Sequence, residues 1–183
     1  MKYICLLRGI NVSGKNSIKM DALIQTFENL GAQNVSTYIQ SGNVVFEHSE
    51  TKSRMLAQKI SDQIYSDFGF EIPVLVLTTK KLQQVIDNNP FPKENTKEIS
   101  ALYVTFLSDK PESKNEMAIL NHKTEAEEIV FTEVAVYLYC PKGYGRTKLN
   151  NNFLENKLKV QATTRNWKTT LKLLEMAATN SLN

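Results

Sequence analysis

The chain has 183 residues, of which 42% are hydrophobic and 22% charged, and its formal net charge is +3 at pH 7. These values are ordinary for a soluble globular protein. No apolar run approaches the roughly 20 residues that a membrane-spanning helix requires, and no cleavage-like site follows the N-terminus. Cys5 and Cys140 lie far apart in apolar segments, which favours buried reduced thiols over a disulfide. We therefore expect a cytoplasmic protein that has no membrane partner.

The first part of the chain predicts the order strand, helix, strand, strand, helix, strand. Apolar residues at helical spacing, such as Leu23 and Phe27, precede a helix-ending Gly31, and Ser41-Gly42-Asn43 is a hairpin signal between two apolar runs. The predicted strands cover 2–8, 34–40, 43–47 and 73–78, and the predicted helices cover 20–30 and 51–68. This order is the ferredoxin-like βαββαβ arrangement, with a short helix over 79–88 appended to it.

The same order then starts again after a break. Residues 89–99 are rich in Asn, Pro and Lys and predict a linker. The predicted strands of the second part cover 101–107, 127–131, 134–140 and 160–164, and the predicted helices cover 113–120, 151–159 and the C-terminal segment. We therefore predict an α+β fold made by tandem duplication of two ferredoxin-like halves, residues 1–88 and 100–183, each with an appended helix. A single α+β sheet of mixed strand order is the competing fold.

A polar, glycine-containing loop from Arg8 to Lys19 lies between the first strand and the first helix. Free backbone N–H groups and the helix dipole favour an anion at such a turn. The spacing Gly9-x4-Gly14-Lys15 fits a P-loop up to its last position, where Asn16 replaces the Ser or Thr that holds Mg²⁺. The hairpin-rich order is also wrong for a parallel P-loop sheet. We therefore favour anion binding without nucleotide hydrolysis.

Topology predicts which polar segments come together. In a βαββαβ sheet the first strand–helix loop and the second hairpin turn emerge at the same edge. Arg would bind an anion through its bidentate fork and Lys as a point charge, while Asn and Ser would orient the ligand. The candidate ligand-binding residues are Arg8, Asn11, Lys15, Ser41 and Asn43 in the first half and Lys148, Arg165 and Asn166 in the second. The alternative is that the Asn and Ser side chains of the first loop only close a turn.

Binding of single-stranded RNA by the second half is the alternative function. The RNA-recognition module is also βαββαβ and stacks bases on aromatic residues of its central strands. Tyr103, Tyr137 and Tyr139 would supply such residues, and the adjacent segment 142–172 has eight basic residues and a single acid. Against this, the glycine–aromatic pattern of that module is missing. Two sheets that pack on each other would instead place these tyrosines in a shared interface.

The sequence indicates no catalytic residue, metal site or cofactor. His48 and His122 lack Cys, His or paired carboxylates at ligand spacing. Neither Cys lies in an activating context, and no residue stands out as a base or nucleophile, so whether the protein is an enzyme stays open. An uncovered sheet face could also pair with a second copy of the chain.

Three segments resemble a known family. They are RGINVSGKNSIKM, TYIQSGNVVF and TTRNWKTTLKLLEM, and they are similar to the hallmark segments of the bacterial "domain of unknown function 1697" family. The resemblance covers nearly the whole chain and implies a compact cytosolic α+β protein of two ferredoxin-like halves. It implies no activity, because the family is uncharacterised. Ser13 stands where many such proteins have a second glycine.

Overall fold

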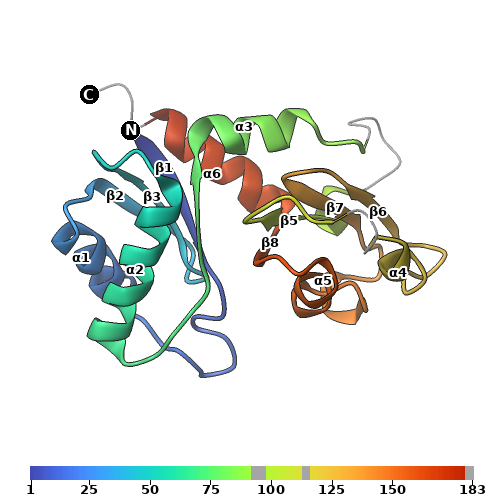
Figure 1. The fold of residues 1–183 in the computed structure, drawn as a ribbon, viewed down its shortest axis with the longest axis horizontal. Helices are drawn as coiled ribbons and strands as arrows, with labels where there is room; N and C mark the ends of the chain where they lie inside the picture. The colour runs from blue at the N-terminus through green and yellow to red at the C-terminus, as the bar shows by residue number, and fades with distance from the viewer. Residues whose placement is uncertain (92–97, 113–115, 180–183) are drawn as a thin grey trace. The chain divides into compact units, whose positions relative to one another are not determined.

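The computed structural model describes residues 1–91, 98–112 and 116–179. Within these residues the chain forms six α-helices and two four-stranded antiparallel sheets, so it is an α+β protein (Figure 1). Both sheets are built from the same order of elements, as the sequence predicts. None of the described helices combines the length and the apolar character needed to span a bilayer.

The first sheet has the strand order β2-β3-β1-β4, with β1 in its centre. Its strands are β1 (Lys2–Leu7), β2 (Gln33–Tyr38), β3 (Asn43–Glu47) and β4 (Val74–Thr78), and its helices are α1 (Met20–Asn29) and α2 (Ser53–Phe68), followed by α3 (Thr79–Asp87). In the register of the sheet, Cys5 lies opposite Val44 on one side and Val76 on the other. These bounds confirm the predicted elements to within about two residues. β2 ends early because the next residue, Ile39, has a left-handed φ of 50°.

Alternate residues of β1 face the two helices of the first half. Tyr3, Cys5 and Leu7 are fully buried in one core with apolar residues of α1 and α2. Phe27 of α1 packs edge-on against Phe46 of β3, with ring centroids 5.1 Å apart. Each buried aromatic or leucine side chain contributes roughly 1.5–3 kcal/mol to folding, so this core holds α1 firmly against the sheet.

The second sheet has the equivalent order β6-β7-β5-β8. Its strands are β5 (Leu102–Leu107), β6 (Glu128–Phe131), β7 (Ala135–Tyr139) and β8 (Ala162–Asn166), and its helices are α4 (Glu116–Leu120), α5 (Asn151–Leu158) and α6 (Trp167–Thr179). β8 starts two residues later than predicted, because Lys159 ends α5 with a left-handed φ of 59°. Residues 113–115 of the predicted helix over 113–120 lie outside the described residues.

The chain divides into two compact units whose boundaries fall inside helices. One unit is Met1–Gln83 together with the segment that begins at Lys172, and the other is Gln84–Leu171. Both α3 and α6 therefore contribute to both units. In the first unit, Lys2 Nζ donates to the Ala177 carbonyl oxygen of α6 at 2.8 Å. In the second unit, the Tyr137 hydroxyl donates to the Val85 carbonyl oxygen of α3 at 2.7 Å. Part of the predicted linker, residues 92–97, lies outside the described residues.

Gly42 allows the β2–β3 turn to approach β1. The Leu7 N–H donates to the Gly42 carbonyl oxygen at 2.8 Å. A Cβ added at Gly42 would lie 2.6 Å from Leu7 Cβ and 3.1 Å from Ile10 Cδ1, and φ is +75° there. The turn can therefore reach this position only without a side chain at residue 42.

We expect Gly42→Ala to lower the free energy of unfolding by about 3 kcal/mol, because left-handed strain adds to a backbone shift. Gly14→Ala is the matched control, because Gly14 has a similar φ of +74° with open space around it. The control should cost about 1 kcal/mol, from strain alone. Urea denaturation of both variants checks this difference, and equal losses would contradict the close approach at residue 42.

Candidate functional site

The loop between β1 and α1 forms a small hairpin. The Lys15 N–H donates to the Val12 carbonyl oxygen at 3.0 Å, and these two residues form an isolated antiparallel bridge. Between them, Ser13 and Gly14 have left-handed φ values of 51° and 74°. Positive φ at both central residues is what a two-residue type I′ turn requires. Because α1 begins only at Met20, the loop does not have P-loop geometry.

Two asparagine side chains hold this hairpin in place. Asn11 Nδ2 donates to the carbonyl oxygens of Ile18 and Gln40, at 3.0 and 2.9 Å. Asn11 Oδ1 accepts from the Ile18 N–H at 2.9 Å, and Asn16 Nδ2 donates to the Gly9 carbonyl oxygen at 3.0 Å. Both residues also have left-handed φ values, which Asn tolerates better than most residues. The Asn11 amide is thus engaged within the protein, which favours the turn-closing alternative at this position.

The β2–β3 turn lies beside the loop, as topology predicts. The bond from Asn11 to Gln40 joins the two segments directly. Asn43 is fully buried, and its Nδ2 donates to the Tyr38 carbonyl oxygen at 3.1 Å and to Ser41 Oγ at 3.0 Å. Asn43 therefore closes the turn from inside the protein, while Ser41 is half-buried at its surface.

The start of α1 has no capping side chain among the described residues. Its N-cap residue, Lys19, is extended, and among the described residues its side chain makes no capping hydrogen bond. The N-cap residue of α2, Lys52, likewise makes no capping hydrogen bond, but there Glu50 Oε1 accepts from the Thr51 and Lys52 N–H groups just before the helix. The first N–H groups of any α-helix lack intrahelical partners, so those of α1 are available for an acceptor. Asp21 is the acidic residue in this first turn.

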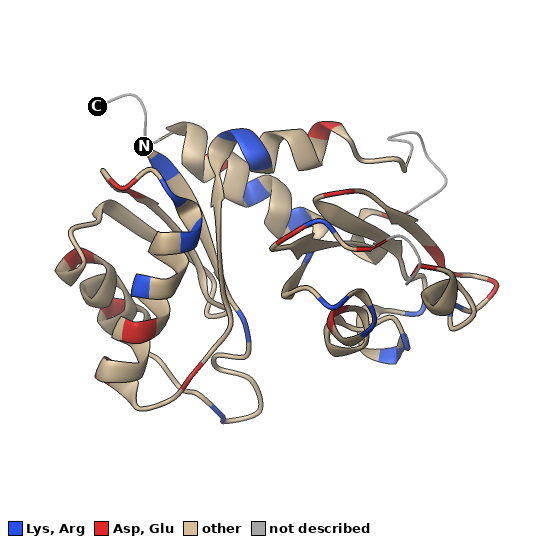
Figure 2. Ribbon diagram, viewed as in Figure 1, with Lys and Arg blue, Asp and Glu red and all other residues tan. Residues whose placement is uncertain are grey.

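Basic residues lie along the loop that precedes this helix start. The sequence from Arg8 to Lys19 contains three basic residues and no acid, and Figure 2 shows Lys and Arg along the loop between β1 and α1. Lys15 and Lys19 are exposed, whereas Arg8 is half-buried. The loop therefore combines positive charge with backbone donors, a combination that suits a small anion.

The predicted residues of the second half lie at helix starts that already have caps. Asn166 Oδ1 accepts from the Thr169 N–H of α6 at 2.7 Å, and the preceding residue, Arg165, donates to the Thr164 carbonyl oxygen at 2.9 Å. Lys148 is exposed two residues before Asn150, whose Oδ1 accepts from the first turn of α5. Of the three predicted residues, Asn166 thus caps a helix, whereas Arg165 donates to a carbonyl oxygen of β8.

The three tyrosines of the RNA-binding alternative do not share a face, so that prediction is wrong in its geometry. Tyr103 of β5 lies opposite Leu138, whereas Tyr137 lies opposite Val104. Because directly opposed residues lie on the same face, Tyr103 is on one face of the sheet and Tyr137 and Tyr139 are on the other. Tyr137 is only 1% exposed, and burial raises its pKa to about 12.

Cys140 belongs to a buried polar cluster that the sequence did not reveal. Burial, with the nearby Glu127 carboxylate, raises the pKa of the Cys140 thiol to about 11, although the Thr147 hydroxyl opposes this shift. Burial also acts to raise the pKa of Glu127, but hydrogen bonds from Thr124 and Thr147 hold it below its usual value. A neutral thiol is a poor nucleophile, so this cluster does not support cysteine catalysis.

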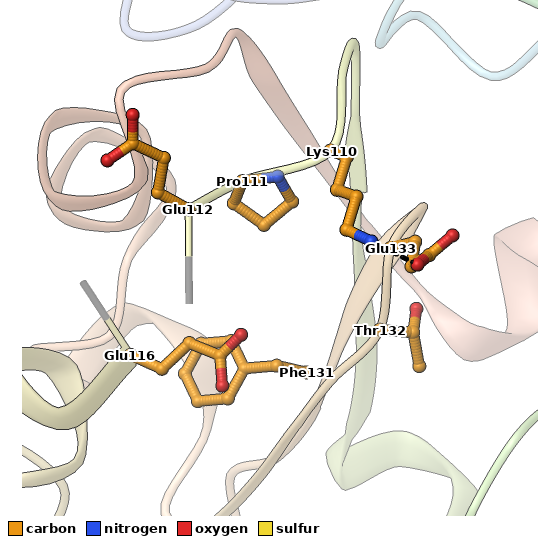
Figure 3. Close-up of a pocket in the computed structure, with 7 residues that line it drawn as sticks. All are labelled: Lys110, Pro111, Glu112, Glu116, Phe131, Thr132 and Glu133. Atoms are coloured by element: carbon orange, nitrogen blue, oxygen red, sulfur yellow. Dashed lines mark hydrogen bonds and ion pairs between the residues drawn. The ribbon is translucent and has the colours of Figure 1, made fainter. Parts of the chain in front are cut away.

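Two surface hollows lie away from the predicted residues. The larger has a volume of about 580 Å³, and Figure 3 shows an ion pair between Lys110 and Glu133 in its lining. Three carboxylates and one ammonium line it, so its charge disfavours a phosphate. The smaller, of about 260 Å³, lies beside Met1 and His48. Within the described ranges, no group of three or more His, Cys, Asp or Glu residues could hold a metal ion.

Comparison with known protein families identifies the family of this chain. The model of the family described as "Protein of unknown function (DUF1697)" matches residues 1–137. The chain belongs to this family. The match covers the candidate residues of the first half and ends before those of the second. None of the curated proteins matches this DUF1697 chain.

One solved structure is similar over almost its whole length. It is that of the conserved bacterial protein SP0830 from Streptococcus pneumoniae, which is 24% identical to the DUF1697 chain. The alignment covers 96% of this chain and 98% of the other, with a TM-score of 0.74. This similarity concerns the fold.

Removal of the Asn11 side chain should destabilise the protein. We expect Asn11→Ala to lower the free energy of unfolding by about 2–3 kcal/mol, because partners at Ile18 and Gln40 lose their bonds and Ala is strained at positive φ. Asn11→Gly relieves the strain but still lacks the side chain, so it should recover about 1 kcal/mol of that loss. Urea denaturation of both variants is the test, and a fully stable Asn11→Ala protein would show that this amide is not structural.

Alkaline pH should weaken the fold through Cys140. Its pKa is raised in the folded state, so the unfolded thiol loses its proton first and stability is lost as the pH rises from about 9 to 11. The loss attributable to this thiol is about 2 kcal/mol. Cys140→Ser carries no thiol, so its free energy of unfolding should fall less than that of the wild type across this interval. Parallel pH profiles of the two proteins would contradict the buried-thiol assignment.

Proposed function

We propose that this protein binds a small phosphorylated or otherwise anionic ligand at the start of α1. The observation that carries the proposal is the absence of a capping side chain there among the described residues, next to the exposed Lys15 and Lys19. Backbone N–H groups at a helix start and the positive end of its dipole attract an anion, and the two lysines add charge. We also infer that each half is a ferredoxin-like unit, which the βαββαβ order and the strand order of each sheet support.

The loop residues have different roles in this proposal. Lys15, Lys19 and the guanidinium of Arg8 neutralise the ligand, and the exposed hydroxyls of Ser13 and Ser17 are available to donate to it. Asn11 acts indirectly, because its bonds hold the loop in one conformation before a ligand arrives. Such preorganisation reduces the entropy lost on binding.

Asp21 sets the charge balance of the proposed site. It lies in the first turn of α1, where a carboxylate stabilises the helix but repels an incoming anion. The ligand must therefore carry enough charge to be attracted by the cations in spite of Asp21. This argument favours phosphates over singly charged carboxylates.

A thermal-shift experiment tests the proposal. The panel contains inorganic phosphate, pyrophosphate, nucleotides, sugar phosphates and phosphate-containing coenzymes, each at low and moderate salt. A ligand present at a hundred times its dissociation constant adds about 2.7 kcal/mol, which raises the midpoint by roughly 5–10 °C at this chain length. We expect at least one phosphate to give such a shift.

Substitutions test whether the ligand binds at the start of α1. The double variant Lys15→Ala, Lys19→Ala should lose the shift, whereas Asp21→Asn should bind about two- to fivefold more tightly because a repulsive charge is gone. Lys80→Ala is the matched control, because Lys80 is an exposed lysine of α3 outside the proposed site. A shift that persists in the double variant would place the ligand elsewhere, and a panel without any shift would overturn the proposal.

A further inference from the structure

Two rings lie together on the surface of the second unit. The His122 and Phe153 ring centroids are 4.8 Å apart, with their planes inclined by 51°. His122 is exposed and follows α4 closely, while Phe153 is half-buried in the first turn of α5, and Figure 1 shows these two helices beside each other. His122 Nδ1 lies 2.8 Å from the Ala118 carbonyl oxygen, which fixes the orientation of the imidazole. The pair therefore presents aromatic surface in a defined position.

One lysine contacts this aromatic pair, and the neighbouring segments carry further basic residues. Lys157 Nζ lies 5.8 Å from the centroid of the Phe153 ring, within the range of a cation–π contact. The loop that leads into α5 and the residue that ends the helix add further cations, and Figure 2 shows these basic segments around α5. The six basic residues of these segments and of the turn after α4 are Lys123, Lys142, Arg146, Lys148, Lys157 and Lys159.

The acidic residues in these segments leave the surface positive. Glu155 Oε2 accepts from the Ala162 N–H at 2.7 Å, so this carboxylate is bound to the start of β8. Glu127 is 7% exposed and accepts from the Thr124 N–H. Glu125 and Glu128 are the exposed acids nearby. Six cations against these four carboxylates leave the segments with a net charge of +2.

We propose that this α5 surface, made of His122, Phe153 and the six cations, binds single-stranded nucleic acid. A base would stack on the aromatic pair, and the lysines and Arg146 would contact the backbone phosphates. Unpaired bases have free faces that stack on Phe or His, whereas a duplex keeps its base faces covered. A purely basic surface would bind any polyanion, so the aromatic pair is the feature that selects a single strand.

This surface differs from both earlier hypotheses about anion binding. It uses none of the three tyrosines that the sequence suggested, of which Tyr137 is buried. It also lies in the second unit, whereas the start of α1 belongs to the first. Variants of one surface therefore leave the other intact, and each proposal can fail without the other.

Fluorescence anisotropy with a labelled oligouridylate of about 12 nucleotides and the full chain tests the inference, since sites of this kind cover about 4–16 nucleotides. The variant Lys148→Glu, Lys157→Glu should bind at least about tenfold more weakly, and the slope of log K against log salt should fall by roughly 1.4, or about 0.7 for each phosphate contact. Lys80→Glu reverses one lysine away from the surface, half the charge change of the double variant, and should bind like the wild type.

A second set of variants tests the stacking contact without a change in charge. Phe153→Leu keeps an apolar side chain against the core, so the fold should survive, but affinity should fall roughly five- to hundredfold with an unchanged salt slope. Phe153→Tyr keeps the ring and should retain affinity. The variant Lys15→Ala, Lys19→Ala should bind the oligonucleotide normally, which separates this result from the ligand at α1.

Several results would overturn the inference. Equal affinity for a duplex of the same length or for polyglutamate would show a general polyanion surface instead. If Phe153→Leu bound the oligonucleotide as tightly as the wild type, no base would stack on this ring. If Lys80→Glu bound it as weakly as the double variant, the binding site would not lie around α5. Absence of binding at about 50 mM salt, where such electrostatic binding is strong, would also reject it.

Discussion

The hydrogen bonds of Asn11 are the constraint on which the first candidate site depends. One side chain joins the loop after β1, the Ile18 segment that precedes α1, and the β2–β3 turn at Gln40. Because these bonds fix the chain on both sides of the Ser13–Gly14 turn, they also fix where α1 begins and which N–H groups it presents. The β2–β3 turn has a corresponding requirement. Residue 42 must be glycine, because the turn approaches Leu7 too closely for a side chain.

Much of the fold could be predicted because the spacing of apolar residues along the chain indicates which side chains are buried. Short apolar runs mark most of the strands, helical spacing marks α1 and α2, and the repeated order of elements follows from these patterns. Register could not be predicted in the same way. Tyr103 and Tyr137 each lie in a mostly apolar strand, so their faces depend on how β5 pairs with β7, and that pairing places them on opposite faces of the sheet.

The candidate site was predictable only in part for a related reason. Topology predicts that the first loop lies beside the β2–β3 turn, and the bond between Asn11 and Gln40 confirms it. The role of each polar side chain depends on partners distant in sequence, so an Asn that caps a helix, as Asn166 does, looks the same in sequence as one that contacts a ligand. The contact between His122 and Phe153 could not be predicted from the sequence either, because the two residues are 31 positions apart in the chain.

The two proposed surfaces recognise negative charge by different physical means, and this difference decides what each can bind. At α1, fixed backbone N–H groups converge on one point, so a compact anion can satisfy several of them at once and little ordering is needed. Around α5, the charges sit at the ends of long side chains along the surface, where salt screens them and each contact contributes little alone. Such an array gains affinity only when many phosphates bind together and an aromatic contact adds to them, which requires an extended strand. A single small phosphate would therefore favour α1, and a polymer would favour α5.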